Sequence, residues 1–137
     1  MKFIFTDKIA IVFFFIVFLS GGCKKEQSIL NSRIISGTIS LEVHAIHHTL
    51  DVSSISIYLK KNTTNFPGKD SSLYEFKGIT DGNGKYTFEK LFPGDYYLYV
   101  SGFDSISGSN VFGNLPVILL TDDLNDNYKE LTVYVSE

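Results

Sequence analysis

The chain has 137 residues, of which 44% are hydrophobic and 20% are charged, and its net charge at pH 7 is −3. A mildly acidic chain lacks the basic surface that binding to nucleic acid requires, so composition argues against nucleic acid as a partner. The length allows one domain of about 100 residues after a leader segment, which is enough for a single two-layer core.

The first 22 residues have the composition of an export signal. Lys2 and Lys8 flank a weakly basic start, an uninterrupted apolar run extends from Ile9 to Leu19, and Ser20-Gly21-Gly22 supplies the small residues that a signal peptidase accepts. An apolar run of this length is too short to span a bilayer, which takes about 20 residues. We therefore expect residues 1–22 to be a cleaved signal helix and not a permanent transmembrane helix.

The only cysteine, Cys23, directly follows these small residues. The stretch L-S-G-G-C resembles the lipobox of bacterial lipoproteins, in the relaxed form found in Bacteroidota, because Leu19 stands four places before the cysteine where three are usual. The resemblance implies that Cys23 is acylated and anchors an outer-membrane lipoprotein of the cell envelope, with residues 23–33 as a flexible tether. The alternative is an ordinary cleaved signal that leaves a free thiol. Two or three acyl chains would anchor the protein stably.

Residues 34–137 show the two-residue period of β-strands. Ile39, Leu41 and Val43 alternate with polar residues, and Ile55, Ile57 and Leu59 do the same. Further strands are expected at Leu73–Ile79, Lys85–Phe88, Tyr96–Ser101, Leu115–Leu120 and Leu131–Val135. Apolar residues nowhere recur at the three- and four-residue spacing of a helix over a helical length. The pattern predicts an all-β fold, a single seven-stranded antiparallel Greek-key sandwich over residues 34–137.

The stretch from Thr80 to Val100, T-D-G-N-G-K-Y-T-F-E-K-L-F-P-G-D-Y-Y-L-Y-V, carries a recognisable signature. It resembles the carboxypeptidase regulatory-domain-like modules, which belong with the prealbumin (transthyretin-like) and Cna-B-like sandwiches. The matching positions are Thr80, Asp81, Gly84, Tyr86, Phe88, Leu91, Pro93, Gly94, Tyr96, Leu98 and Val100. The resemblance implies a non-catalytic accessory module. H-H at 47–48, F-P-G at 66–68 and G-D-Y-Y-L-Y at 94–99 also look like a group of small stand-alone Bacteroidota lipoproteins.

Motifs for catalysis are lacking. The chain has no G-x-S-x-G elbow, no H-E-x-x-H pair and no phosphate-binding loop, and its sole cysteine is the expected anchor. We therefore expect no enzymatic activity and no obligatory cofactor. The expected partners are the membrane, through the lipid anchor, and an envelope protein or a glycan; whether the domain faces the periplasm or the medium stays open.

All three histidines, His44, His47 and His48, lie close together in the sequence, with Asp51 nearby. Imidazole nitrogens are ligands for Zn or Cu, so one hypothesis is a transition-metal site formed by these four residues. The alternative is a solvated loop in which the histidines are simply polar.

Tyrosines suggest a second binding hypothesis. Tyr97 and Tyr99 share the strand face opposite Tyr96, and Tyr58 is expected to point outward as well. A row of exposed rings on a sandwich would stack on sugars, whereas the alternative is that the rings form cross-strand pairs or cover the edge of the core.

Two covalent modifications are suggested by residue type alone. Cna-B-like pilus modules often carry a Lys–Asn isopeptide bond in the core, for which Lys60, Lys61 and Asn127 are candidates; alternation places Lys60 outside, which argues against it. Asp104-Ser105-Ile106 fits a short O-glycosylation pattern of Bacteroidota at Ser105.

Overall fold

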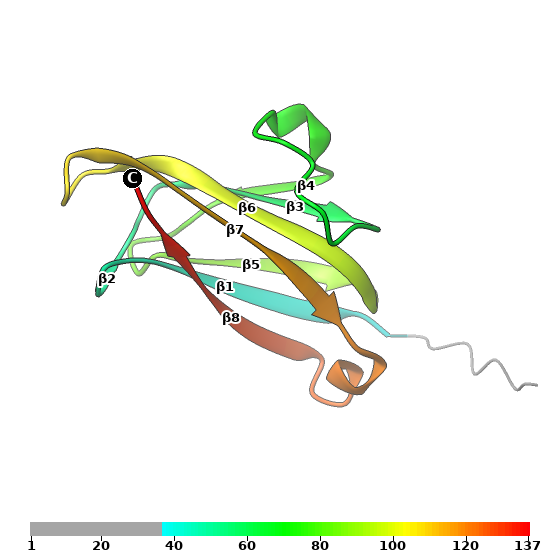
Figure 1. Ribbon diagram of the computed structural model, residues 1–137. Coiled ribbons are helices and arrows are strands. Elements are labelled where there is room, and N and C mark those ends of the chain that lie inside the picture. Colours follow the sequence, from blue (N-terminus) through cyan, green and yellow to red (C-terminus); the bar gives the residue numbers. More distant parts are fainter. Residues whose placement is uncertain (1–36) are drawn as a thin grey trace, which may run out of the picture. The chain divides into compact units, whose positions relative to one another are not determined.

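The computed structural model describes residues 37–137 (Figure 1). The predictions for the signal peptide, for Cys23 and for the tether lie outside these residues. Within residues 37–137 the chain forms eight strands and two short 3₁₀ turns. No helix in this part of the chain is long and apolar enough to cross a membrane.

Four strands make up each of two sheets that pack face to face. Sheet A contains β1 (Ile39–His47), β2 (Leu50–Asp51), β5 (Lys85–Leu91) and β8 (Tyr128–Val135). Sheet B has the order β4 (Phe76–Ile79), β3 (Ser56–Lys61), β6 (Gly94–Asp104) and β7 (Ser109–Leu119). The 3₁₀ turns are η1 (Ser71–Leu73) and η2 (Thr121–Leu124). The expected all-β Greek-key sandwich class is confirmed, because strands that are distant in the sequence, such as β3 and β6, are neighbours in each sheet.

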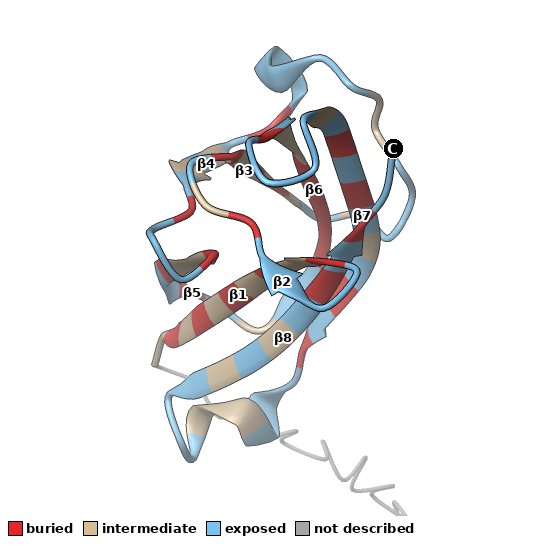
Figure 2. Cartoon of the chain, turned by 90° about the vertical axis from the view of Figure 1, so that its left-hand side faces the viewer, coloured by how far each residue is buried: buried red, intermediate tan, exposed pale blue. Residues whose placement is uncertain are grey.

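Hydrophobic alternation places the core between the sheets. Along β1 every second residue from Ile39 to His47 is buried, and the residues between them are half-buried. The same alternation gives a buried Ile57 and Leu59 in β3, and Leu98 and Val100 in β6 complete the centre of the core. Figure 2 shows the resulting stripes of buried and half-buried residues along β1. The two-residue period was therefore a sufficient guide to which side chains form the core.

One strand pair differs from the expected antiparallel arrangement. β8 lies parallel to β1, from Ser40 opposite Tyr128 to His47 opposite Val135. The reason is the route of the chain. β7 ends beside Gly94, at the end of the sandwich where β1 begins, and η2 crosses from sheet B to sheet A at this same end. β8 must therefore start there and run in the direction of β1.

Strand boundaries also differ from the prediction in several places. The segment from Leu73 does not begin a strand, because Ser71–Leu73 forms a 3₁₀ turn and β4 starts only at Phe76. The side chain of Asp70 accepts a hydrogen bond from the backbone N–H of Ser72 at 2.8 Å, which favours this turn over an extended start. β5, β6 and β7 extend beyond the predicted ranges, and the two-residue strand β2 was not predicted.

The outer edge of β7 is protected against pairing with another chain. Pro116, which has no backbone N–H, lies within this edge strand. The ammonium group of Lys129 donates a hydrogen bond to the backbone carbonyl of Ile118 at 3.0 Å, and it also contacts Asp123 at 2.9 Å. A proline and a covered carbonyl remove two of the groups that a new strand would need.

The turn between β4 and β5 fixes one end of the sandwich. The hydroxyl of Thr80 is buried; it donates to the carbonyl of Val52 at 2.9 Å and accepts from the N–H of Ile55 at 3.1 Å. The carboxylate of Asp81 accepts from the N–H groups of Asn83 and Lys85, each at 2.9 Å. The side chain of Thr80 therefore holds the loop before β3, and the side chain of Asp81 stabilises the β4–β5 turn itself.

Replacing Thr80 by Val should lower the free energy of unfolding by about 1–3 kcal/mol, because the N–H of Ile55 and the carbonyl of Val52 lose their partner inside the protein. Urea unfolding of the full-length protein measures the change. Thr132→Val, on the exposed side of β8, is the matched control and should change the free energy of unfolding little. Equal effects of the two substitutions would contradict the assigned role of Thr80.

Candidate functional site

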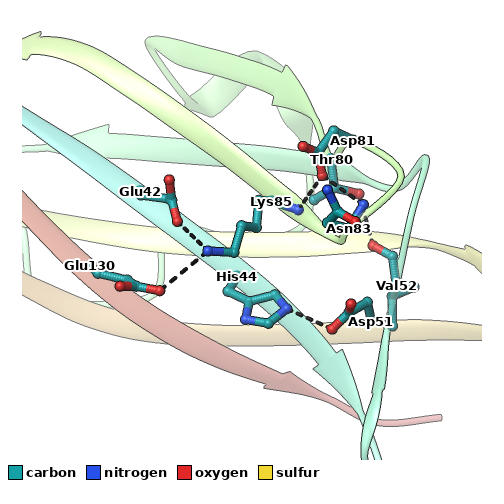
Figure 3. A network of polar contacts seen from close by, with 9 residues as sticks. All are labelled: Glu42, His44, Asp51, Val52, Thr80, Asp81, Asn83, Lys85 and Glu130. Carbon is teal, nitrogen blue, oxygen red and sulfur yellow. Dashed lines mark hydrogen bonds and ion pairs between the residues drawn. The ribbon is translucent and has the colours of Figure 1, made fainter.

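The histidines lie at one end of β1, but their side chains do not share one side of the strand. His44 points to the outer face of sheet A, where its Nε2 lies 2.7 Å from Oδ1 of Asp51 (Figure 3). The side chains of this pair are 20% and 49% exposed, so water screens their interaction. Two of the four residues predicted to bind a metal are therefore adjacent, and they are paired with each other.

His47 points the opposite way, into the end of the core. It is buried, and its Nδ1 lies 2.9 Å from Oδ2 of Asp104, which is also buried. Because β1 belongs to sheet A and β6 to sheet B, this pair joins the two sheets across the end of the sandwich. The hydrogen bond with His47, followed by one from the N–H of Ile106 at 2.9 Å, lowers the pKa of Asp104.

His48 sits in the turn after β1 with a left-handed backbone, φ 56°, and its ring stacks on that of His47 with 4.2 Å between centroids. The structure therefore does not bring His44, His47, His48 and Asp51 together around one point, because successive strand residues face opposite sides of a sheet. No group of three or more His, Cys, Asp or Glu side chains within residues 37–137 is arranged to hold a metal ion.

Asp104 was missed by the sequence reasoning, although a signal was present. Tyr96, Leu98 and Val100 occupy the inward positions of β6, and Asp104 falls on the same alternation. A charged residue at a core position requires a buried partner, but only the packing of sheet B on sheet A identifies that partner as His47, 57 positions earlier.

The outer face of sheet A carries a network of charges (Figure 3). The ammonium group of Lys85 lies 2.5 Å from a carboxylate oxygen of Glu42 and 3.5 Å from one of Glu130. Its hydrogen bond to Glu42 raises the pKa of Lys85 and lowers that of the glutamate. These side chains are between 21% and 52% exposed, so the network is a solvated surface feature and contributes little to stability.

The tyrosine row expected to be exposed is covered. Tyr97 and Tyr99 do lie on the outer face of sheet B, but both are buried, at 7% and 4% exposure. The expected exposure of these two rings, on which stacking on sugars depends, is therefore not found. The segment 62–75 folds over them, and the ring of Phe66 lies 5.7 Å from that of Tyr97 and 5.6 Å from that of Tyr99, between centroids.

The same aromatic cluster continues through Tyr99 to Tyr58 and Tyr74 on the outside of sheet B. The half-buried ring of Tyr58 lies 5.6 Å from that of Tyr74 and 5.9 Å from that of Tyr99, between centroids. Two of the hydroxyl groups have partners, because Tyr97 donates to Asn114 and Tyr74 donates to the carbonyl of Gly68, each at 2.7 Å. Burial raises the pKa of Tyr74 to about 12. The rings therefore pack against one another across neighbouring strands, which was the alternative to an exposed row.

Glu75 fastens the end of this covering segment to β3. Its carboxylate accepts from the ammonium group of Lys60 at 2.9 Å and from the N–H of Lys61 at 3.1 Å. Lys60 therefore lies on the outer face, as the alternation predicted, and not in the core where an isopeptide bond would form.

Comparisons with known proteins point to the same fold. No protein-family model matches the chain, and no curated protein is similar in sequence. Among solved structures, a variant of BcpA, the major pilin subunit of Bacillus cereus, is 17% identical with a TM-score of 0.50, and the match covers 74% of this chain and 30% of the pilin. The SpaB basal pilin from Lactobacillus rhamnosus GG is 12% identical with a TM-score of 0.46, over 74% of this chain and 98% of that one.

A 9R-lipoxygenase from Cyanothece is also similar, at 17% identity and a TM-score of 0.41, over 73% of this chain and 17% of the enzyme. Identities this low bear on the fold alone, and the chain spans less than a third of the length of BcpA. A transthyretin-like architecture is compatible with the likeness to BcpA. The chain therefore has a β-sandwich fold of the kind found in pilin subunits.

Proposed function

We propose that this chain is a non-catalytic, lipid-anchored binding or accessory module at the outer membrane of the cell envelope. The observation that carries the proposal is the β-sandwich of residues 37–137, whose fold is similar to that of the pilin subunit BcpA and which follows the lipobox-like stretch ending at Cys23. β1 starts at Ile39, shortly after the proposed anchor Cys23, and runs for nine residues to His47. At about 3.3 Å per residue this strand spans roughly 30 Å, most of the length of the domain.

The direction of β1 defines two ends of the domain. The first, where β1 begins, also holds the β5–β6 turn and η2, because Ile39 lies opposite Leu91 and Gly94 lies opposite Leu119. The second, which we call the far end, holds the β1–β2 turn, the β4–β5 turn and the β6–β7 turn, joined through His47 with Asp104 and through Ala45 with Gly84.

Lipid anchoring is tested with the full-length protein. We expect the wild-type protein to enter the detergent phase on Triton X-114 partitioning and its N-terminal peptide to carry acyl chains by mass spectrometry. Cys23→Ser should move the protein to the aqueous phase or leave it as an unprocessed precursor, because no thiol remains to be acylated. Ser32→Ala, outside the lipobox, is the control. A wild-type protein in the aqueous phase with a free thiol at Cys23 would refute the anchor.

A further inference from the structure

Part of the outer face of sheet B is left open by the segment that covers the tyrosines. In the register of β6 and β7, Ser101 lies opposite Phe112 and Phe103 lies opposite Asn110. Ser101 and Phe103 continue the outward alternation of Tyr97 and Tyr99, so all four residues share the outer face. The side chains of Phe103 and Phe112 are 57% and 38% exposed.

These four residues, Ser101, Phe103, Asn110 and Phe112, are called here the β6–β7 platform. The two rings are diagonal neighbours, and the hydroxyl and the amide occupy the other two corners. Ser56 extends the polar side, because it lies opposite Ser101 on β3. Exposed apolar rings therefore alternate with hydrogen-bonding groups over a spacing of about 5 Å, the distance between neighbouring strands.

The platform is held rigidly. β6 and β7 pair continuously from Gly94 opposite Leu119 to Asp104 opposite Ser109, and the buried pair of Asp104 with His47 ties the hairpin to sheet A. The ammonium group of Lys69, from the segment 62–75, lies over the face of the Phe112 ring at 4.8 Å from its centroid. A ligand on Phe103 would thus meet a fixed ring, two polar side chains and a cation at the rim, at little cost in ordering.

We propose that the β6–β7 platform binds the pyranose ring of a polysaccharide. The apolar face of a sugar ring packs on an aromatic ring, and its hydroxyl groups require donors and acceptors beside that ring, which the Ser101 hydroxyl and the Asn110 amide provide. A stable protein partner would instead need about 800 Å² of surface on each side, with an apolar centre. On the platform the apolar groups alternate with polar ones, so a sugar fits it better.

The site is distinct from the tyrosine row suggested by the sequence. Tyr97 and Tyr99 lie on the same face, but the segment 62–75 covers them. Phe103 stays 57% exposed, and Phe112 stays 38% exposed although Lys69 of that segment lies over its ring. The proposal is independent of the lipid anchor. The anchoring test measures acylation of Cys23, whereas the binding test measures the affinity of the platform for a polymer.

Affinity gel electrophoresis of the full-length protein in a non-ionic detergent tests the proposal. The probes are a soluble β-1,3-glucan, xylan and polygalacturonate. We expect retardation by at least one polymer and a loss of affinity of about tenfold in Phe103→Ala, since an aromatic contact of this size is worth roughly 1.4 kcal/mol. Phe92→Ala is the matched control, because Phe92 is similarly exposed, at 61%, but lies in the β5–β6 turn at the opposite end.

Each other outcome is decisive. Retardation of the wild-type protein by none of the three polymers, or equal losses in Phe103→Ala and Phe92→Ala, would overturn the proposal. So would self-association that Phe103→Ala abolishes in the absence of polymer binding, because the platform would then be a contact between copies. Binding to polygalacturonate alone, weakened by Lys69→Ala, would support the site and identify the rim cation as the partner of a sugar carboxylate.

Discussion

Gly84→Ala is expected to lower the free energy of unfolding by about 3 kcal/mol or more. A Cβ at this position would lie 2.8 Å from the carbonyl oxygen of Ala45 and 2.9 Å from the nitrogen of Val52. These two backbone groups are hydrogen-bonded to each other, and the N–H of Ala45 also donates to the carbonyl of Gly84, so they cannot move apart without breaking the turn. The left-handed backbone, φ +69°, adds strain for any other residue.

The same turn contains the control. A Cβ at Gly82 would meet nothing within 4 Å, so Gly82→Ala should leave the urea midpoint almost unchanged. The pair of variants therefore separates close backbone approach from a general preference for glycine in turns. Similar unfolding curves for Gly84→Ala and the wild-type protein would show that the β4–β5 turn approaches Ala45 and Val52 less closely than these distances imply.

Asp104→Ala is expected to lower the melting temperature by about 5 °C or more at pH 7, because buried His47 loses its partner and the N–H of Ile106 loses its acceptor. Asp51→Ala is the matched control, since it removes the partner of a histidine at the exposed face, where water replaces the contact. Differential scanning calorimetry of both variants measures the difference, and equal shifts would contradict a structural role for the buried pair.

The pH dependence of the Asp104 effect has a defined sign. The pKa of Asp104 is lowered in the folded protein, chiefly by the hydrogen bond with His47, so its contribution to stability is complete above the unfolded pKa of about 4 and is lost as the pH falls through the folded value. The melting temperatures of the wild-type protein and of Asp104→Ala should therefore converge as the pH is lowered below about 4. A gap that stays constant from pH 7 to pH 3 would exclude ionised Asp104 as the source of the stabilisation.

Local sequence patterns were enough to predict the class of the fold and the composition of its core. Alternation in β1, β3 and β6 identifies Leu41, Ile57 and Leu98 as inward residues, and all three are fully buried. The turn from Thr80 to Gly84 was also predictable from the sequence, because positive φ and side-chain-to-backbone hydrogen bonds depend only on nearby residues. Strand ends were less predictable, since they depend on how far a neighbouring strand continues.

The surface of sheet B shows where local patterns fail. Tyr99 and Phe103 have the same alternation and similar side chains, yet one is 4% and the other 57% exposed. The difference comes from the segment 62–75, whose Phe66 and Tyr74 reach Tyr99 but not Phe103. A segment that folds over a strand does not change the residue alternation within that strand, so the sequence of the strand does not reveal the covering.

By itself the sequence determined where most strands lie, though not where they end, and which side chains of β1, β3 and β6 face the core, because residue alternation and turn chemistry depend on neighbours within a few positions. Only the tertiary structure decided that β8 runs parallel to β1, that His47 pairs with Asp104 and not with His44, and that Phe103 rather than Tyr97 is open to a ligand. Each of these depends on contacts between segments far apart in the chain, and burial and pairing at such contacts are set by the packing of whole sheets.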